Sequence, residues 1–325
     1  MTPIAEAGTW AGAAAGEEER GAGRGLVRAH AVRAHAVLRV EAGQDGSARV
    51  VEARSAVPLV LRHTGTTTPP RAAAEAPAAG SAGAAAAGVT RVQDLAPPAL
   101  PTVTVHLVGA AAGPLAGDQV RLDITVGAGV RLVLRSVAAT LAMPGHGPGP
   151  SVLEIHADVA AGGALDLLPE PTVAVRGCRH RMVGRAVVAA GGWLRWREEV
   201  LLGRFGEPSG RVETDLRVDI RAPAGDRPLL RQQLPLGPDV LGLTGAALIG
   251  SARAVGSLLI AAPAPTAGIG PAGLGVPASV IPPPAPGATR TPGGAAVLPL
   301  AGPGVLVTAL AADAVTLRRH LGPEG

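Results

Sequence analysis

The stretch GPLAGDQVRLDITVGAG, residues 113–129, contains the pattern that decides the fold. A turn-rich segment leads to Asp118, and from there apolar and polar residues alternate as far as a glycine turn. The apolar residues of this run are Val120, Leu122, Ile124 and Val126. A period of two places them on one face of an extended chain, which predicts a β-strand with one face in solvent.

Strand-like runs separated by glycine-rich turns occur five times, at residues 37–54, 120–135, 152–168, 186–200 and 212–234. Glycine turns between alternating runs are typical of β-hairpins. An isolated hairpin is only marginally stable, so these units are expected to stack into one continuous body. The sequence therefore predicts a mainly β fold of stacked β-hairpins, either β-helix-like or layered.

The C-terminal part of the chain departs from this pattern. Small residues at helical spacing predict a short helix over residues 245–255, and apolar runs predict strands at residues 257–261 and 304–308. A final helix is expected to begin near Asp313 and to end at Arg318-Arg319-His320, because an acid at the start and bases at the end complement the helix dipole. About two helices are thus expected near the C-terminal end.

Three segments have too few apolar residues to contribute to a core. Residues 1–25 are rich in Ala, Gly and Glu and are predicted to be a disordered tail, whereas residues 66–100 and 262–297 are predicted to be low-complexity loops. The remaining chain, residues 26–325, is expected to form a single β domain.

Composition excludes several functional classes. The chain of 325 residues has no lysine and a net charge of +4, and its arginines are dispersed, so no nucleic-acid partner is expected. No signal peptide is evident, and the apolar run at residues 240–250 is too short to span a membrane. The single cysteine, Cys178, cannot form an intramolecular disulfide, which fits a reducing compartment. A soluble cytoplasmic protein with no membrane partner is expected.

Common catalytic motifs are missing from the sequence. A phosphate-binding loop and Schiff-base chemistry both need a lysine, and the chain has none. No G-x-S-x-G elbow of a serine hydrolase occurs either.

Two groups of residues remain as candidates for metal chemistry. Cys178 and His180 lie two residues apart, so on a strand both side chains point to the same side and offer ligands suited to nickel, zinc or copper. The alternative interpretation is a packed cysteine beside an exposed histidine.

Acidic residues form the second group. Glu170 stands between two prolines, and an apolar strand follows Glu198 and Glu199. That strand ends in a turn whose residues are Gly203, Arg204, Gly206 and Glu207. One interpretation is an acid-lined passage for a cation, and the other is a solvated strand end with an Arg–Glu ion pair.

Taken in order, these motifs resemble the UreD family of urease accessory proteins, also called UreH. The resemblance extends over roughly residues 35–321. It rests on the turn Gly113–Asp118, Ala138-Ala139-Thr140, the Leu-Leu-Pro-Glu run ending at Glu170, the segment from Glu198 to Glu207, and the apolar run at residues 298–307. The sequence departs from the family in having Ala116-Gly117-Asp118 where the family has Gly-Gly-Asp, and Thr140-Leu141-Ala142-Met143 without the usual tyrosine.

The resemblance implies a scaffold and not an enzyme. Proteins of this family bind apo-urease, recruit the helical accessory protein UreF and, through it, the GTPase UreG, which delivers nickel. It also implies a β-helical stack of strands and a nickel tunnel, with transient nickel and no permanently bound cofactor. Asp118 corresponds to the family's aspartate at the turn beside this passage, and Glu170 and Glu207 are the next candidates along it.

Two questions stay open on the sequence alone. Asp118 is also a residue type that caps its own turn. The competing functions are a generic β-rich binding module and a hydrolase that depends on Cys178 and His180. The apolar segment from about Val240 onward is the candidate contact for the helical partner.

Overall fold

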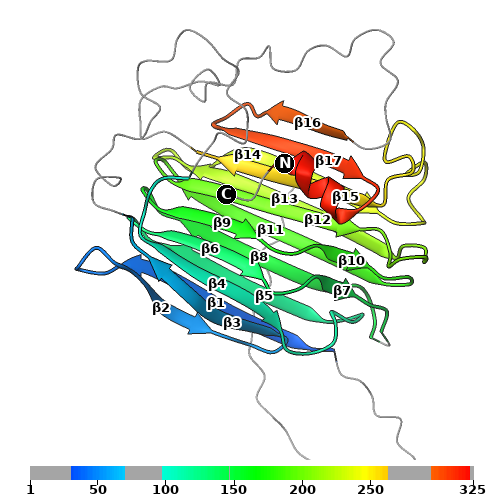
Figure 1. Ribbon diagram of the computed structural model, residues 1–325, viewed down its shortest axis with the longest axis horizontal. Helices are drawn as coiled ribbons and strands as arrows, with labels where there is room; N and C mark the ends of the chain where they lie inside the picture. The colour runs from blue at the N-terminus through cyan, green and yellow to red at the C-terminus, as the bar shows by residue number, and fades with distance from the viewer. Residues whose placement is uncertain (1–30, 70–96, 146, 263–293, 323–325) are drawn as a thin grey trace, which may run out of the picture. The chain divides into compact units, whose positions relative to one another are not determined.

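The computed structural model describes residues 31–69, 97–145, 147–262 and 294–322 (Figure 1). Two β-sheets face each other in the unit that begins at Ala31, which confirms the prediction of a mainly β fold. The predicted tail at residues 1–25 lies outside the described residues.

The described part of the chain contains seventeen strands and one helix. In chain order they are β1 (Arg33–Ala42), β2 (Ala48–Arg54), β3 (Leu59–Thr67), β4 (Thr102–Gly109), β5 (Gln119–Val126), β6 (Arg131–Ser136), β7 (Thr140–Ala142), β8 (Ser151–Val159), β9 (Ala164–Leu168), β10 (Thr172–Ala174), β11 (Arg179–Ala189), β12 (Trp193–Leu201), β13 (Arg211–Arg221), β14 (Arg227–Leu236), β15 (Ala254–Ala261), β16 (Gly294–Pro299), β17 (Gly304–Ala311) and α2 (Ala314–Leu321).

Parallel strands form the centre of each sheet. Sheet A has the order β14-β13-β11-β8-β5-β1-β2, and its strands from β13 to β1 are parallel. Sheet B has the order β16-β17-β15-β12-β9-β6-β4-β3, and its strands from β12 to β4 are parallel. The short strands β7 and β10 pair with each other, and β10 also pairs with β12.

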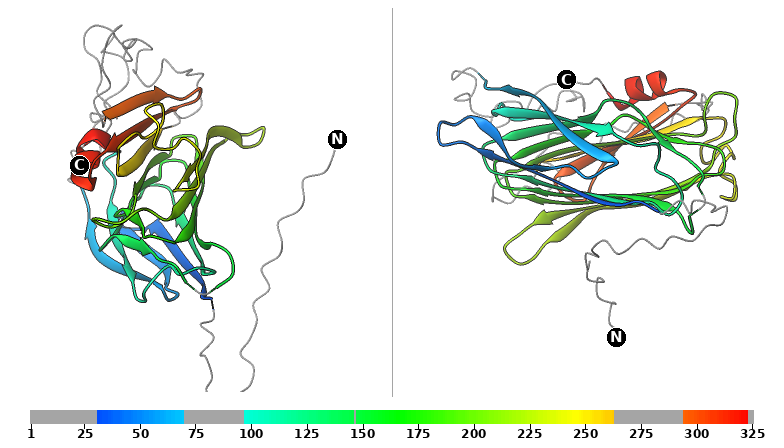
Figure 2. Two further views of the ribbon diagram at one scale, coloured as in Figure 1. Left: turned by 90° about the vertical axis from the view of Figure 1, so that its right-hand side faces the viewer. Right: turned by 90° about the horizontal axis from the view of Figure 1, so that it is seen from below.

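The chain passes from one sheet to the other at almost every turn. β5, β8 and β11 lie in sheet A, and the strands that follow them, β6, β9 and β12, lie in sheet B. The result is a β-solenoid of about four turns, closed at its ends by antiparallel strands. Figure 2 shows the two sheets edge on.

Three of the five predicted hairpins are wrong, and two are confirmed. Residues 37–54 and 212–234 do form antiparallel hairpins, β1–β2 and β13–β14. Residues 120–135, 152–168 and 186–200 instead turn a corner between the sheets, and each strand pairs with the next coil. A hairpin and a corner have the same alternation and the same glycine turn, so the pattern alone does not distinguish them.

Corner glycines stack along the solenoid. Gly129, Gly162 and Gly191 occupy equivalent turns with φ values of 71°, 70° and 79°. The N–H of Gly129 donates to the carbonyl of Gly162 at 3.0 Å, and the N–H of Gly162 donates to Gly191 at 3.0 Å. Residues other than glycine rarely adopt this left-handed backbone conformation, which explains why glycine recurs at these corners.

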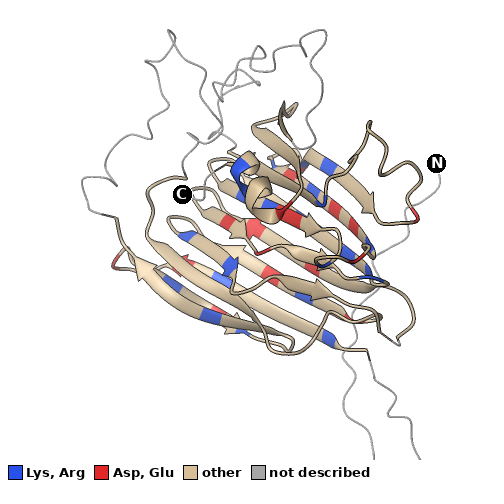
Figure 3. Cartoon of the chain, turned by 45° about the vertical axis from the view of Figure 1, so that its right-hand side comes forward, with Lys and Arg blue, Asp and Glu red and all other residues tan. Residues whose placement is uncertain are grey.

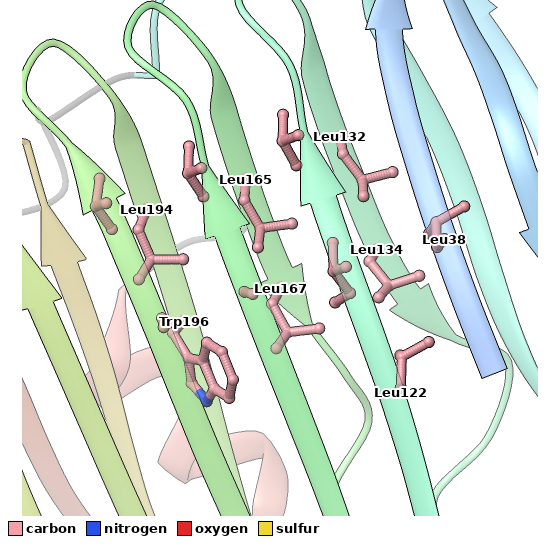
Figure 4. Close-up of a cluster of buried hydrophobic side chains, with 14 of the residues drawn as sticks. Leu38, Leu122, Leu132, Leu134, Leu165, Leu167, Leu194 and Trp196 are labelled. Carbon is pink, nitrogen blue, oxygen red and sulfur yellow. The ribbon is translucent and has the colours of Figure 1, made fainter. Parts of the chain in front are cut away.

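Leucine side chains from both sheets fill the space between them. Figure 4 shows Leu38 and Leu122 from sheet A opposite Leu132, Leu165 and Leu194 from sheet B. All five are buried. The alternation that predicted these strands therefore marks the core correctly.

At the C-terminal end, the predicted strands and the final helix are confirmed. Strands β15 and β17 include the predicted runs. Helix α2 starts after Asp313, whose carboxylate accepts a bond from the N–H of Thr316 at 2.9 Å. It lies on the outer face of sheet B (Figure 2). Its Leu317 and Leu321 are buried against β15 and β17.

The second predicted helix, over residues 245–255, is wrong. Residues 245–251 form turns, and Ala254 and Val255 begin β15. Gly242 and Gly250 adopt φ values of 73° and 56°, which interrupt helical geometry. Pairing of β15 with both β12 and β17 satisfies its backbone groups on both sides.

The predicted loops fit only in part. Residues 294–297 belong to β16, an edge strand that pairs with β17. The loop predicted over residues 262–297 therefore ends before residue 294. Residues 66 and 67 likewise complete β3. Residues 70–96 and 263–293 lie outside the described residues. Among the described residues, no helix is long and apolar enough to cross a membrane.

Candidate functional site: an acid-lined cavity at a break in sheet B

Sheet B is interrupted between β9 and β10. The ladder of β9 with β12 ends at the pair Leu167–Trp196, and the ladder of β10 with β12 starts at Thr172–Val200. Between these two pairs, residues 168–171 run beside residues 197–199 outside either ladder. Pro169 and Pro171 have no N–H to donate, so the local sequence itself favours this break.

A cavity of about 380 Å³ lies at the level of the break. Its walls come from both sheets and are mainly apolar, including Leu122, Ile155, Leu167, Met182 and Trp196. The charged residues of the lining are Glu170, Arg197, Glu198 and Glu199. The structure therefore brings together Glu170 and the Glu198-Glu199 pair, which are far apart in the sequence.

Glu198 lies on the inner face of sheet B. It is buried, and its Oε1 accepts a hydrogen bond from the Trp196 indole Nε1 at 3.2 Å. Burial raises the pKa of Glu198 to about 7; the Trp196 bond opposes this rise and the charge of Asp215 adds to it. The carboxyl group thus exchanges its proton near neutral pH.

Glu199 points to the opposite face and contacts helix α2. Its Oε2 accepts bonds from Nε and Nη2 of Arg318, each at 3.1 Å. Nη2 of Arg318 also donates to Oε2 of Glu170 at 2.6 Å. Figure 3 shows acidic positions on the strands beside α2. Arg318 was anticipated only as a base at the end of the last helix, since no local motif links it to a residue more than a hundred positions away.

Asp118 stabilises the turn that precedes β5. It is 5% exposed, and its two carboxylate oxygens accept bonds from the N–H groups of Val32 and Leu115, each at 2.8 Å. Gly117 beside it has a φ of 89°. The cavity lining includes Gly113 and Pro114 of this turn, and Asp118 contributes to the site by fixing that loop.

Glu207 lies in a separate turn between β12 and β13. It accepts bonds from the backbone N–H, Nε and Nη2 of Arg204, each at 3.0 Å, and these bonds lower its pKa to about 2. Gly203 and Gly206 make the turn possible with φ values of 85° and 75°. This is the Arg–Glu pair of the second interpretation, and Glu207 is not part of the cavity lining.

Cys178 and His180 are both buried, so the alternative of an exposed histidine is wrong. Burial raises the pKa of the Cys178 thiol to about 11, and its Sγ lies 3.7 Å from the carbonyl of Arg211. Burial lowers the pKa of His180 to about 4, and its Nδ1 lies 2.9 Å from Oγ of Ser151. A protonated thiol is a poor nucleophile, which argues against a cysteine-dependent hydrolase.

Within the described ranges, no group of three or more His, Cys, Asp or Glu side chains is arranged to hold a metal ion. The cavity instead offers separate carboxylates on the two sides of one sheet. The fold and the site together define a β-solenoid scaffold with a mainly apolar cavity that carries three glutamates.

Comparisons with known proteins identify this scaffold. The family model of the UreD urease accessory protein matches residues 32–323. The chain is 54% identical to urease accessory protein UreD of Frankia casuarinae, over 90% of this chain and 88% of the relative. It is 54% identical to the UreD of Frankia alni, over 90% and 91%, and 35% identical to UreD 1 of Saccharopolyspora erythraea, over 89% and 93%.

The chain therefore belongs to the UreD family of urease accessory proteins. Members of this family are non-catalytic chaperones that take part in the maturation of urease. The family resemblance and the prediction that the chain is not an enzyme are both confirmed, and the alternative of a Cys178–His180 hydrolase is wrong.

Proposed function

We propose that this chain serves nickel insertion into apo-urease by conducting Ni²⁺ through its internal cavity. The observation that supports this proposal is the convergence of Glu170, Glu198 and Glu199 on one cavity at the break in sheet B. Nickel is here the cargo of the protein and not a resident cofactor.

Separate carboxylates suit transport better than storage. A closed set of several ligands would bind the ion tightly, whereas single carboxylate oxygens bind a divalent cation weakly and release it. Glu198 adds a further property, because a carboxyl group with a pKa of about 7 loses its proton easily when a cation arrives. The remainder of the wall is mainly apolar.

Asp118, Glu207, Cys178 and His180 have weaker support as contacts for the ion. Asp118 holds the loop that lines the cavity near Gly113, and it remains a candidate for direct contact with nickel. Glu207 and Cys178 are close enough that the carboxylate charge raises the pKa of the thiol. Cys178 and His180 are the weaker candidates for a contact with the passing ion.

We also propose that the chain binds apo-urease and a helical partner of the UreF type, and through it a GTPase of the UreG type, in the cytoplasm. Phe205 lies on the loop between β12 and β13, Leu241 and Leu248 lie on the loop between β14 and β15, and all three side chains are exposed. These loops are connected, because Arg253 Nη2 donates to the carbonyl of Glu207 at 2.8 Å. Exposed apolar clusters of this kind mark protein contacts.

The first test measures urease and not this chain. The urease operon is expressed with and without this gene in limiting nickel, and purified urease is assayed for nickel per active site and for urea hydrolysis. The proposal requires nickel-poor, inactive urease without the gene. Unchanged nickel loading without the gene would contradict it and favour a generic binding module.

The cavity is tested with matched variants in the same assay. Glu170→Gln and Glu198→Gln are expected to lower nickel loading, whereas Glu52→Gln on the exposed face of β2 should not. Ala139→Trp places a large side chain at the exposed rim of the cavity, and Ala53→Trp is its control on β2. Normal nickel loading by a folded Ala139→Trp variant would exclude the cavity as the route.

A further inference from the structure

The break in sheet B has a carboxylate on each side of it. Glu198 and Glu199 are consecutive residues of β12, so their side chains alternate between the inner and outer faces. Glu198 binds Trp196 inside the sandwich, and Glu199 binds Arg318 on the outside. Both residues belong to the lining of the same cavity.

Arg197 spans the break between the strands. Its Nη2 donates to the carbonyls of Leu168 and Pro169 at 3.3 and 3.0 Å. These are carbonyls of the segment where the two prolines interrupt the ladder. The buried side chain of Arg197 thus supplies hydrogen bonds to this segment where the strand ladder is interrupted.

Arg318 neutralises the outer side of the break. Its guanidinium group contacts Glu170 and Glu199 simultaneously, and the Glu199 side chain is 0% exposed. Burial alone would lower the pKa of Arg318, but the bonds to the two carboxylates outweigh this effect and raise it. The guanidinium group thus takes the position beside both carboxylates that a divalent cation would need.

The helix that carries Arg318 is a small attachment. Helix α2 has eight residues, and only Leu317 and Leu321 are buried. These two leucines pack over Gly256 of β15, where an added Cβ would approach each at 3.0 Å. A short element with two buried side chains is of the type that opens locally without unfolding the sheet beneath it.

We propose that Arg318 is a displaceable counter-ion that closes the break in sheet B, and that a divalent cation crosses the sheet between Glu199 and Glu198 when Arg318 withdraws. This proposal rests on the proposed function for its cargo, but the closure by Arg318 does not depend on it. Glu199 already faces two guanidinium groups, since Arg197 Nε lies 3.8 Å from its Oε1 and Arg318 Nη2 lies 3.1 Å from its Oε2. A divalent cation would add to this positive charge, so its entry requires Arg318 to withdraw.

The test compares Arg318→Ala with Arg319→Ala in the full-length chain. Arg319 is the exposed neighbour on the same helix and provides a matched loss of charge. Arg318→Ala is expected to bind Ni²⁺ about tenfold more tightly than the wild type, because two carboxylates lose their cation. It should also increase quenching of tryptophan fluorescence by acrylamide, since Trp196 lies in the cavity wall.

Further variants make the result decisive. Glu199→Gln added to Arg318→Ala should abolish the gain in Ni²⁺ affinity. If Arg318→Ala does not fold, Arg318→Lys keeps the charge and loses the forked contact, and a smaller gain in both signals is expected. A folded Arg318→Ala variant that matches Arg319→Ala in Ni²⁺ affinity and quenching would overturn the proposal.

The two proposals fail in different experiments. If Ala139→Trp leaves nickel loading of urease intact while Arg318→Ala still opens the cavity to acrylamide, the passage is refuted and the closure stands. If Ala139→Trp blocks loading while Arg318→Ala changes neither signal, the passage stands and the closure by Arg318 is refuted.

Discussion

Glu198 and Glu199 are adjacent in the chain, yet one carboxyl group binds Trp196 inside the β-sandwich and the other binds Arg318 on its outer surface. Their pKa values and partners differ accordingly. Glu198 has no arginine bonded to it among the described contacts, and burial dominates its pKa. Glu199 is bonded to the guanidinium group of Arg318 and lies 3.8 Å from that of Arg197. The predictions below follow from this and similar local environments.

Glu198 is expected to make the native state less stable as pH rises. Its pKa rises from 4.5 to about 7 on folding, so the native state binds more protons than the unfolded state between these values. Relative to the wild type, Glu198→Gln should gain up to ~3 kcal/mol between pH 4.5 and 7. Chemical denaturation at pH 5 and pH 7.5 measures this, and a pH-independent difference would contradict it.

His180 has the opposite effect. Its pKa falls from 6.5 to about 4 on folding, so the unfolded state binds more protons in this window and the native state loses stability as pH falls. His180→Gln should remove this acid-dependent loss, which amounts to at most ~3 kcal/mol, and the exposed control His63→Gln should not. Parallel pH slopes for the two variants would refute this assignment.

Asp118 is expected to matter for folding even if nickel never touches it. Asp118→Ala leaves the N–H groups of Val32 and Leu115 without their acceptor, which should cost about 2–5 kcal/mol, and Asp118→Asn should cost roughly half of that. Thermal unfolding measures both. If Asp118→Ala is as stable as the wild type but fails in nickel loading, the carboxylate acts on nickel directly.

Gly184 admits the Trp196 ring into the core. A Cβ at this position would lie 2.6 Å from Leu216 Cδ1 and 2.7 Å from Trp196 Cζ2. Gly184→Ala is therefore expected to destabilise the protein by about 1–3 kcal/mol and to shift the tryptophan emission. Gly65→Ala, where a Cβ meets nothing within 4 Å, is the matched control. Equal melting temperatures for the two variants would contradict this packing.

Much of the fold could be predicted because each strand carries its own signal. Alternation identified which side chains of β5 enter the core, and Asp313 together with the terminal arginines identified α2. The sequence predicts hairpins where the structure has corners. A hairpin would pair β6 with β5, whereas in the structure β6 pairs with β4 and β9. Pairing with the neighbouring coils is favoured because it buries the inner faces of both sheets in one core.

The candidate site was likewise predictable only where the signal is local. Glu170 lies between two prolines and Glu198-Glu199 precede an apolar run, and both patterns can be read from neighbouring residues. Their common cavity and the ion pair with Arg318 join residues separated by more than a hundred positions, and no local pattern encodes such a contact. The opposite outcome occurred at Glu207, whose partner Arg204 is three residues away and was anticipated as an ion pair.

The sequence by itself determined the alternating strands, the positions of the glycine turns, the last helix and the family, because these depend on the identity of residues close together in the chain. Only the tertiary structure decided that the strands form a two-sheet solenoid, that sheet B breaks beside Pro169 and Pro171, and that Arg318 binds Glu170 and Glu199 there. These features require distant segments to share one core and to neutralise one another's buried charges, and only the folded chain brings those segments together.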